Sequence, residues 1–205
     1  VQTQEFSFWV MSEATAARII NIDFDGNRNN PGPNSEPLTY VGQGAAAGGT
    51  IFNSLAADSR LEDGSDDDNL TVSGTELLNS IGTATPVSFT ISPVGGDSSA
   101  GRSGGNTDDP ANPAALMSDY IFNNSAGNQA GQSPFTIAGL GSASTVDLYF
   151  YKSMGSVFIS GQQPSAFAAT GIFTPANTVY FAGVPVTEGQ VAGTIGGGVT
   201  VIGGK

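Results

Sequence analysis

Oxygen-bearing side chains occupy alternate positions in the stretch that runs from Asp25 through Asn27 to Asn29. Together with Glu36, they stand where an EF-hand loop carries side-chain ligands for calcium. An EF-hand itself is excluded, because Asn30 replaces the glycine of that loop, prolines follow, and no helix is indicated on either side. Two interpretations remain: a calcium-binding loop between strands, or a loop whose Asp and Asn side chains cap its own backbone.

The chain contains no His and no Cys, which removes several classes of catalysis. A Ser-His-Asp triad, a His-ligated zinc site and a thiolate nucleophile are all excluded. Paired carboxylates remain possible, because glycoside hydrolysis needs two acids on opposite sides of a bond. Most acidic residues fall in predicted turns, whereas Asp23 and Asp147 lie on predicted strands, where the simplest interpretation is an outward-facing acid in water. We therefore expect a protein that is not an enzyme, with a carboxylate-dependent polysaccharide-active enzyme as an alternative.

Sugar binding requires aromatic rings for stacking and polar groups for the hydroxyls. Tyr149 and Tyr151 share one parity of a predicted strand, so their side chains face the same way. If Leu148 and Phe150 point into the core, the two tyrosines form an exposed aromatic platform. If the parity is reversed, the tyrosines belong to the core and their hydroxyls reach its rim. The candidate ligand-binding residues are Trp9, Tyr40, Asp147, Tyr149 and Tyr151.

Composition narrows the range of partners. The formal net charge is −12, from 6 basic and 18 acidic residues, so phosphate backbones are repelled and nucleic acid is excluded as the main partner. No run of 18 apolar residues occurs, so no transmembrane helix is predicted. Two N-x-S/T sequons, at Asn69 and Asn123, are candidate N-glycosylation sites in a secreted protein.

Two-residue alternation of apolar and polar side chains recurs along the chain and indicates β-strands with one buried face. The clearest strands are predicted at residues 5–10, 18–24, 86–91, 145–151 and 178–181. Further strands are predicted at residues 38–41, 50–53, 70–73, 135–137, 156–159, 171–174, 190–195 and 199–202. Turn-forming Gly, Pro and Asn residues separate them, as in a sandwich or barrel.

Helical signal is confined to two short stretches, a single turn at 76–80 and an apolar face at 114–121 that is also compatible with a strand. Residues 93–113 lack apolar periodicity and are rich in Gly, Pro and Asp, which predicts a long surface loop inserted into the domain. The expected fold is a single all-β domain over residues 1–205, a mainly antiparallel, jelly-roll-like β-sandwich with long Gly- and Asp-rich loops and little helix.

Four segments of the sequence carry a family resemblance. They resemble secreted β-sandwich domains of bacteria and fungi, of the galactose-binding-like and malectin-like type. The segments are INIDFDG (residues 20–26), YVGQGAAAGGTIFNSL (40–55), PFTIAGLGSASTVDLYFY (134–151) and TVYFAGVPVTEGQVAGTI (178–195). The resemblance implies an extracellular jelly roll associated with polysaccharide recognition, sometimes with a structural calcium ion.

These observations together predict a secreted, non-catalytic carbohydrate-binding or cell-surface protein with a glycan as its partner. An alternative is a structural, self-assembling extracellular protein, favoured by the richness in Gly, Ala, Ser and Thr and by a possible free edge strand at residues 199–202.

Overall fold

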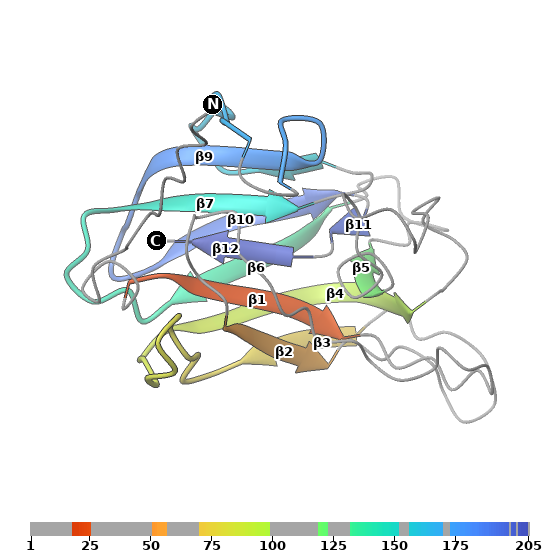
Figure 1. The fold of residues 1–205 in the computed structure, drawn as a ribbon, viewed down its shortest axis with the longest axis horizontal. Coiled ribbons are helices and arrows are strands. Elements are labelled where there is room, and N and C mark those ends of the chain that lie inside the picture. The colour runs from red at the N-terminus through yellow and green to blue at the C-terminus, as the bar shows by residue number, and fades with distance from the viewer. Residues whose placement is uncertain are drawn as a thin grey trace, which may run out of the picture.

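The computed structural model describes residues 18–25, 51–56, 70–98, 119–122, 132–151, 156–169, 173–196, 198–199 and 201–204. These residues form two β-sheets and contain no helix, which confirms the predicted all-β class (Figure 1). The strands are β1 (Ile20–Asp25), β2 (Phe52–Ala56), β3 (Leu70–Gly74), β4 (Ser88–Ser98), β5 (Asp119–Phe122), β6 (Ser133–Ala138), β7 (Thr145–Tyr151), β8 (Ser156–Phe158), β9 (Thr178–Pro185), β10 (Val191–Gly196), β11 (Gly198–Val199) and β12 (Val201–Gly204).

The smaller sheet has five strands in the order β2-β1-β12-β7-β9. The larger has seven, in the order β11-β5-β4-β6-β10-β8, with β3 also paired to β4. All pairings are antiparallel except that of β1 with β2, which is parallel. The strand arrangement is therefore mainly antiparallel, as predicted.

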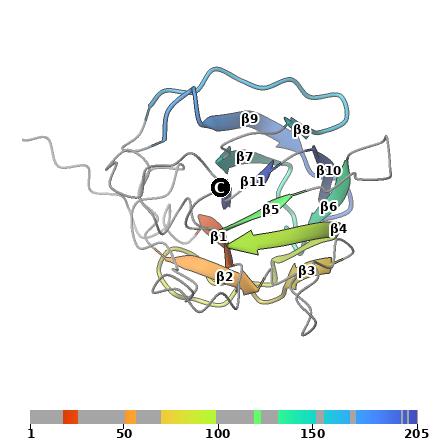
Figure 2. The ribbon, with the colours of Figure 1, turned by 90° about the vertical axis from the view of Figure 1, so that its right-hand side faces the viewer.

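The two sheets pack face to face around aromatic side chains, as in a β-sandwich. Phe24 of the five-stranded sheet lies 5.6 Å from Phe89 of the seven-stranded sheet, measured between ring centroids. Phe135 and Phe150 make a second contact between the sheets, also at 5.6 Å. These four rings are buried within one hydrophobic cluster to which both sheets contribute. Figure 2 shows the strands of the two sheets on opposite sides of this core.

The predicted helical turn at 76–80 is wrong. Glu76 has a φ of 52°, outside the right-handed helical region, and Leu78 forms an isolated antiparallel bridge with Ala84. Buried Asn79 accepts hydrogen bonds from the backbone N–H groups of Ile81 and Thr83 through its Oδ1 atom. Its short amide thus competes with a helix for the local backbone donors, as Asx side chains do.

Three further boundaries differ from the prediction. In the stretch 114–121, the described part belongs to strand β5, so the strand interpretation holds there. Strand β4 continues to Ser98, so the first residues of the predicted loop at 93–113 are strand, and residues 99–113 lie outside the described residues. The predicted edge strand at 199–202 is wrong for its second half, because β12 pairs with both β1 and β7. Its first residue, Val199, falls in β11, which does lie at an end of the seven-stranded sheet.

Candidate binding site on the outer face of the five-stranded sheet

Strand β7 directs its residues alternately into the core and onto the outer face of the sheet. Leu148 and Phe150 belong to the hydrophobic cluster between the sheets. Tyr149 and Tyr151 consequently project from the opposite face, and Asp147 shares their parity. Both tyrosines are nonetheless buried, because further parts of the chain cover this face.

Three rings meet on the outer face and form what we term the outer aromatic cluster: Tyr149, Tyr180 and Phe167. Tyr149 and Tyr180 are directly opposite one another on β7 and β9, and their rings stack with centroids 4.6 Å apart. Phe167 packs edge-on against Tyr149 at 5.9 Å and lies 6.1 Å from Tyr180. Cross-strand aromatic pairs of this kind stabilise a sheet.

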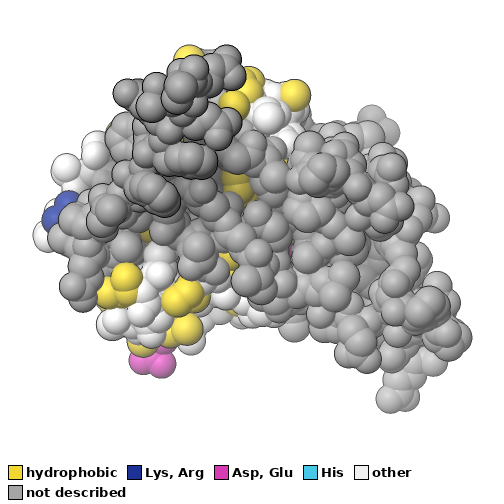
Figure 3. All heavy atoms as spheres, viewed as in Figure 1, with side chains coloured by type: hydrophobic (Ala, Val, Ile, Leu, Met, Phe, Trp, Pro, Cys, Tyr) yellow, Lys and Arg dark blue, Asp and Glu magenta, His cyan; other side chains and the backbone are white. Residues whose placement is uncertain are grey.

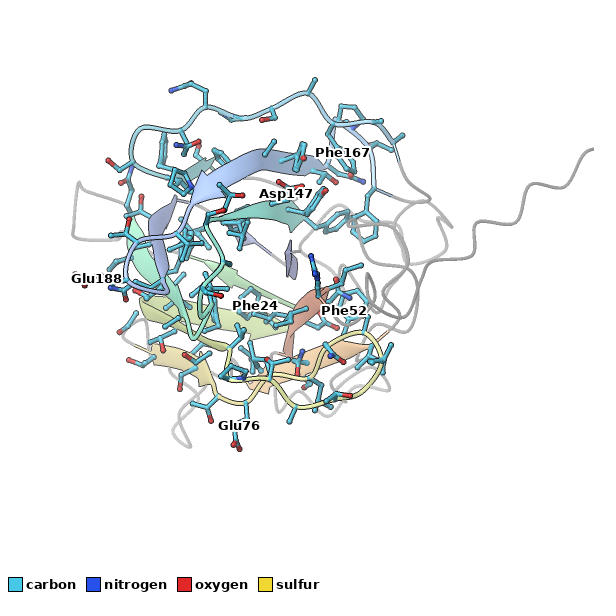
Figure 4. The ribbon with its side chains drawn as sticks, turned by 90° about the vertical axis from the view of Figure 1, so that its left-hand side faces the viewer. Phe24, Phe52, Glu76, Asp147, Phe167 and Glu188 are labelled. Atoms are coloured by element: carbon cyan, nitrogen blue, oxygen red, sulfur yellow. The ribbon has the colours of Figure 1, made fainter. Side chains whose placement is uncertain are left out.

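Phe167 comes from the segment 159–169, which connects β8 toward β9 and passes over the outer face (Figure 4). Ser165 attaches this segment to β9 in two ways. Its backbone N–H donates to the Tyr180 carbonyl at 2.7 Å, and its hydroxyl accepts from the Ala182 N–H at 3.2 Å. The backbone pairing and the ring contacts together place Phe167 over the tyrosine pair.

Asp147 lies at a β-bulge. Val146 pairs with Val184 and Leu148 with Phe181, so the single residue Asp147 opposes two residues of β9. One of those two is Gly183, whose φ of 61° suits a residue without a side chain. The Asp147 carboxylate accepts the Gly183 N–H at 2.8 Å and the Tyr180 hydroxyl at 3.2 Å. The carboxylate therefore serves the bulge and the outer aromatic cluster at once, and it remains partly exposed.

The environment favours the neutral form of both cluster tyrosines. Burial raises the pKa of Tyr149 well above its ordinary value, and the Tyr180 hydroxyl and the Asp147 charge act in the same direction. Burial also raises the pKa of Tyr180; its hydrogen bond with Tyr149 opposes this effect, while Asp147 adds to it. At neutral pH the Tyr180 hydroxyl is thus a stable donor to the carboxylate.

Tyr151 makes a separate contact beyond the cluster. It is almost fully buried and packs edge-on against Phe173, with ring centroids 5.4 Å apart. The exposed Tyr149–Tyr151 platform considered from the sequence is therefore not formed, and the alternative of tyrosines in the central core is also wrong. The tyrosines occupy a second buried layer, which strand periodicity alone does not reveal because the covering segment is distant in sequence.

Asp23 also differs from its simplest interpretation. It is only 1% exposed, whereas the sequence suggested an acid in water. Asp147 fits that interpretation in part, since it is partly exposed but hydrogen-bonded.

The other predicted site residues are mostly outside the described part of the chain. Asp25 ends strand β1, where only its backbone is described, and it pairs with Ala56. The candidate residues outside the described part are Trp9, Asn27, Asn29, Glu36, Tyr40, Asn69 and Asn123. The calcium loop and the glycosylation sites therefore stay predictions. Among the described residues, no three or more Asp, Glu, His or Cys side chains gather as a metal-binding group. No helix in this part of the chain has the length and apolarity to cross a membrane.

Two residues of the site were not among the candidates. Tyr180 had a usable signal, because it alternates with apolar residues in the segment TVYF and that strand pairs with β7. Phe167 had no comparable signal, since it lies in a segment of Gly, Gln, Pro, Ser and Ala without periodicity. Its position depends on tertiary packing.

Comparison with protein-family models, with curated proteins and with solved structures finds no match to this chain. The chemistry open to this site therefore depends on its own groups. These are one carboxylate, two phenol hydroxyls and three rings, which suit hydrogen bonding to a polar ligand combined with contact to an apolar surface.

Proposed function

We propose that this protein is a secreted, non-catalytic carbohydrate-binding or cell-surface protein that contacts a glycan with the outer face of β7 and β9. One observation carries the proposal: Asp147, Tyr180 and Phe167 come together on that face, and all three are partly exposed. A carboxylate and a phenol hydroxyl bind sugar hydroxyls, and an aromatic ring packs against the apolar face of a sugar.

The position of these residues in the sheet supports the proposal. Strand β9 is at one end of the five-stranded sheet, so a long chain-like ligand can approach from the sheet edge. The resemblance to galactose-binding-like and malectin-like domains supports the same ligand class and an extracellular location. Glycoside hydrolysis needs two carboxylates, whereas Asp147 is the single carboxylate among the described groups of this site.

Binding of the full chain to a glycan array and to polysaccharides in affinity gels, with and without calcium, tests the proposal. Asp147→Asn removes the charge but keeps the shape, and Tyr180→Phe removes one hydroxyl. Loss of a hydrogen bond to a charged group is worth about 1.5–3 kcal/mol, so we expect Asp147→Asn to weaken binding about tenfold or more.

Glu188→Gln is the matched control, because Glu188 is an exposed carboxylate in the β9–β10 turn, away from Asp147 (Figure 4). Two results contradict the proposal: absence of binding to every glycan, or binding that both site variants leave unchanged. Release of reducing sugar by the wild-type chain in the same samples would instead identify an enzyme.

A second candidate function, self-assembly, is favoured by one different observation. Phe158 on the terminal strand β8 is 50% exposed, the highest value among the large hydrophobic residues described as exposed. Few of the described side chains on the face shown in Figure 3 are charged. Light scattering of the wild type and of Phe158→Gln tests this function: concentration-dependent oligomers that the substitution abolishes support it, and a monomeric wild type contradicts it.

A further inference from the structure

Two phenol side chains face each other across β7 and β9. Tyr149 and Tyr180 occupy directly opposite positions on the two strands, and their rings stack with centroids 4.6 Å apart and planes only 16° from parallel. In the other described ring contacts of the tyrosines on this face, the partner ring is a phenylalanine. Among the described residues, this pair is therefore the place where two oxidisable phenols lie nearly parallel and in contact.

The hydroxyl groups of the pair are connected to a carboxylate. The Tyr149 hydroxyl is hydrogen-bonded to the Tyr180 hydroxyl, which in turn donates to the Asp147 carboxylate at 3.2 Å. Tyr149 is only 7% exposed, whereas Tyr180 and Asp147 are partly exposed. One-electron oxidation of a phenol releases its hydroxyl proton, so a carboxylate that already accepts this hydrogen bond is in place to receive the proton.

We propose that Tyr149 and Tyr180 form an intramolecular dityrosine cross-link when the protein meets a one-electron oxidant, such as the species that haem peroxidases make from hydrogen peroxide. One oxidant equivalent takes an electron from Tyr180, whose hydroxyl proton passes to Asp147 and from there to solvent. A second equivalent takes an electron from Tyr149 through the stacked rings, and its proton leaves along the same chain of hydroxyls.

The two phenoxyl radicals then couple, and a bond forms between the ring carbons next to their hydroxyls. Each of these carbons gives up its hydrogen to the phenol oxygen of its own ring, so the product keeps both hydroxyls. In total the pair has lost two electrons to the oxidant and two protons to solvent. Because the rings are already held in contact, coupling within one molecule is favoured over coupling between molecules.

The cross-link has a structural use in this chain. The sequence contains no Cys, so no disulfide can join its strands. Strand β9 lies at one end of the five-stranded sheet, and a carbon–carbon bond to β7 holds this terminal strand in place. The cross-link does not depend on the proposed glycan binding.

Photo-oxidation of the full chain with a ruthenium tris(bipyridine) complex and persulfate, which supplies a small one-electron oxidant, tests the proposal. The product should be a monomer that has lost the mass of two hydrogen atoms and shows dityrosine fluorescence. Trypsin cleavage after Lys152 separates Tyr149 from Tyr180, which is the only tyrosine of residues 153–205. Mass spectrometry should therefore find residues 103–152 and 153–205 covalently linked, and fragmentation should assign the bond to Tyr149 and Tyr180.

Three kinds of variant complete the test. Tyr149→Phe and Tyr180→Phe each remove one phenol and should abolish the linked peptides, whereas Tyr151→Phe on the same strand should leave their yield unchanged. Asp147→Asn should slow formation of the link about tenfold or more, because the proton then lacks its acceptor. The purified cross-linked monomer should melt at a higher temperature than the untreated chain, since a covalent link restricts the unfolded state.

A wild type without the linked peptides, linked peptides that persist in Tyr180→Phe, or a bond through Tyr151 would each overturn the proposal. An equal rate in Asp147→Asn would overturn the role of Asp147 as proton acceptor, and an unchanged melting temperature would overturn the structural role of the link.

Discussion

Replacement of Gly139 by alanine tests how the turn after β6 is built. Gly139 has a φ of 77°, in the left-handed region that residues with a side chain avoid. A Cβ atom added there would overlap the carbonyl oxygen of Pro86 and lie 2.6 Å from its carbonyl carbon and 3.1 Å from the Cα atom of Val87. These obstacles are backbone atoms, which cannot rotate away as a side chain can.

Gly141, two residues further along, separates the two effects. Its φ is 59°, but a Cβ atom there would meet nothing within 4 Å. A left-handed conformation costs a residue with a side chain about 1–2 kcal/mol. Overpacking against fixed atoms adds about 1–3 kcal/mol. Gly139→Ala should therefore lower the free energy of unfolding by about 2–5 kcal/mol, and Gly141→Ala by about 1–2 kcal/mol.

Urea unfolding followed by circular dichroism measures both values. If the slope of the free energy with urea is the same in all three proteins, the shift in midpoint gives the change in stability. Equal losses for the two variants would show that the contact with Pro86 is absent or easily relieved, and a neutral Gly139→Ala would show that the turn does not have the conformation described here.

Two further predictions concern the aromatic residues. The pKa values of Tyr149 and Tyr180 are raised in the folded state, so their contribution to the free energy of unfolding is fully present below the ordinary tyrosine pKa of about 10 and is lost as the pH rises above it. Alkaline spectrophotometric titration should find that these two hydroxyls ionise at a higher pH than a free phenol. A Tyr149→Phe/Tyr180→Phe chain whose stability falls with pH as steeply as that of the wild type would refute this. Phe150→Ala should cost about 3–5 kcal/mol, since Phe150 is fully buried between the sheets, whereas Phe158→Ala at the exposed edge should change the free energy of unfolding by about 0.5 kcal/mol or less; comparable losses in urea unfolding would contradict the assignment of the core.

Strand periodicity predicted most of what depends on local pattern. Strand β7 has the predicted bounds of 145–151. Leu148 and Phe150 point into the core, which is one of the two strand parities considered from the sequence. Strand β9 extends beyond the predicted 178–181, because Gly183 forms a β-bulge and does not end the strand. After the bulge, Val184 is again buried in the core. The sequence shows the glycine but not the partner strand that makes it a bulge.

Burial on the outer face could not be predicted in the same way. Alternation identifies two faces of a strand, and it assigns the polar face to solvent unless another segment covers it. Tyr149 is covered through Phe167, which is 18 residues away along the chain and carries no periodic signal. Asp23 alternates with the apolar residues Ile22 and Phe24, which predicts an exposed position, yet it is buried. Burial of an outer strand face by a distant segment depends on tertiary packing, and the β-propensity of the strand residues does not determine it.

The outer face of the five-stranded sheet connects β1 with β7 through the register of β12. Asn21 and Tyr149 both lie opposite Gly203 of β12, so no side chain from that strand stands between their two rows. The outer face of the seven-stranded sheet differs in chemistry, with Thr90, Thr136 and Thr194 among its described residues. Asn21 and Asp23, both buried, therefore share a face with Asp147 and Tyr180, the groups proposed to bind a glycan.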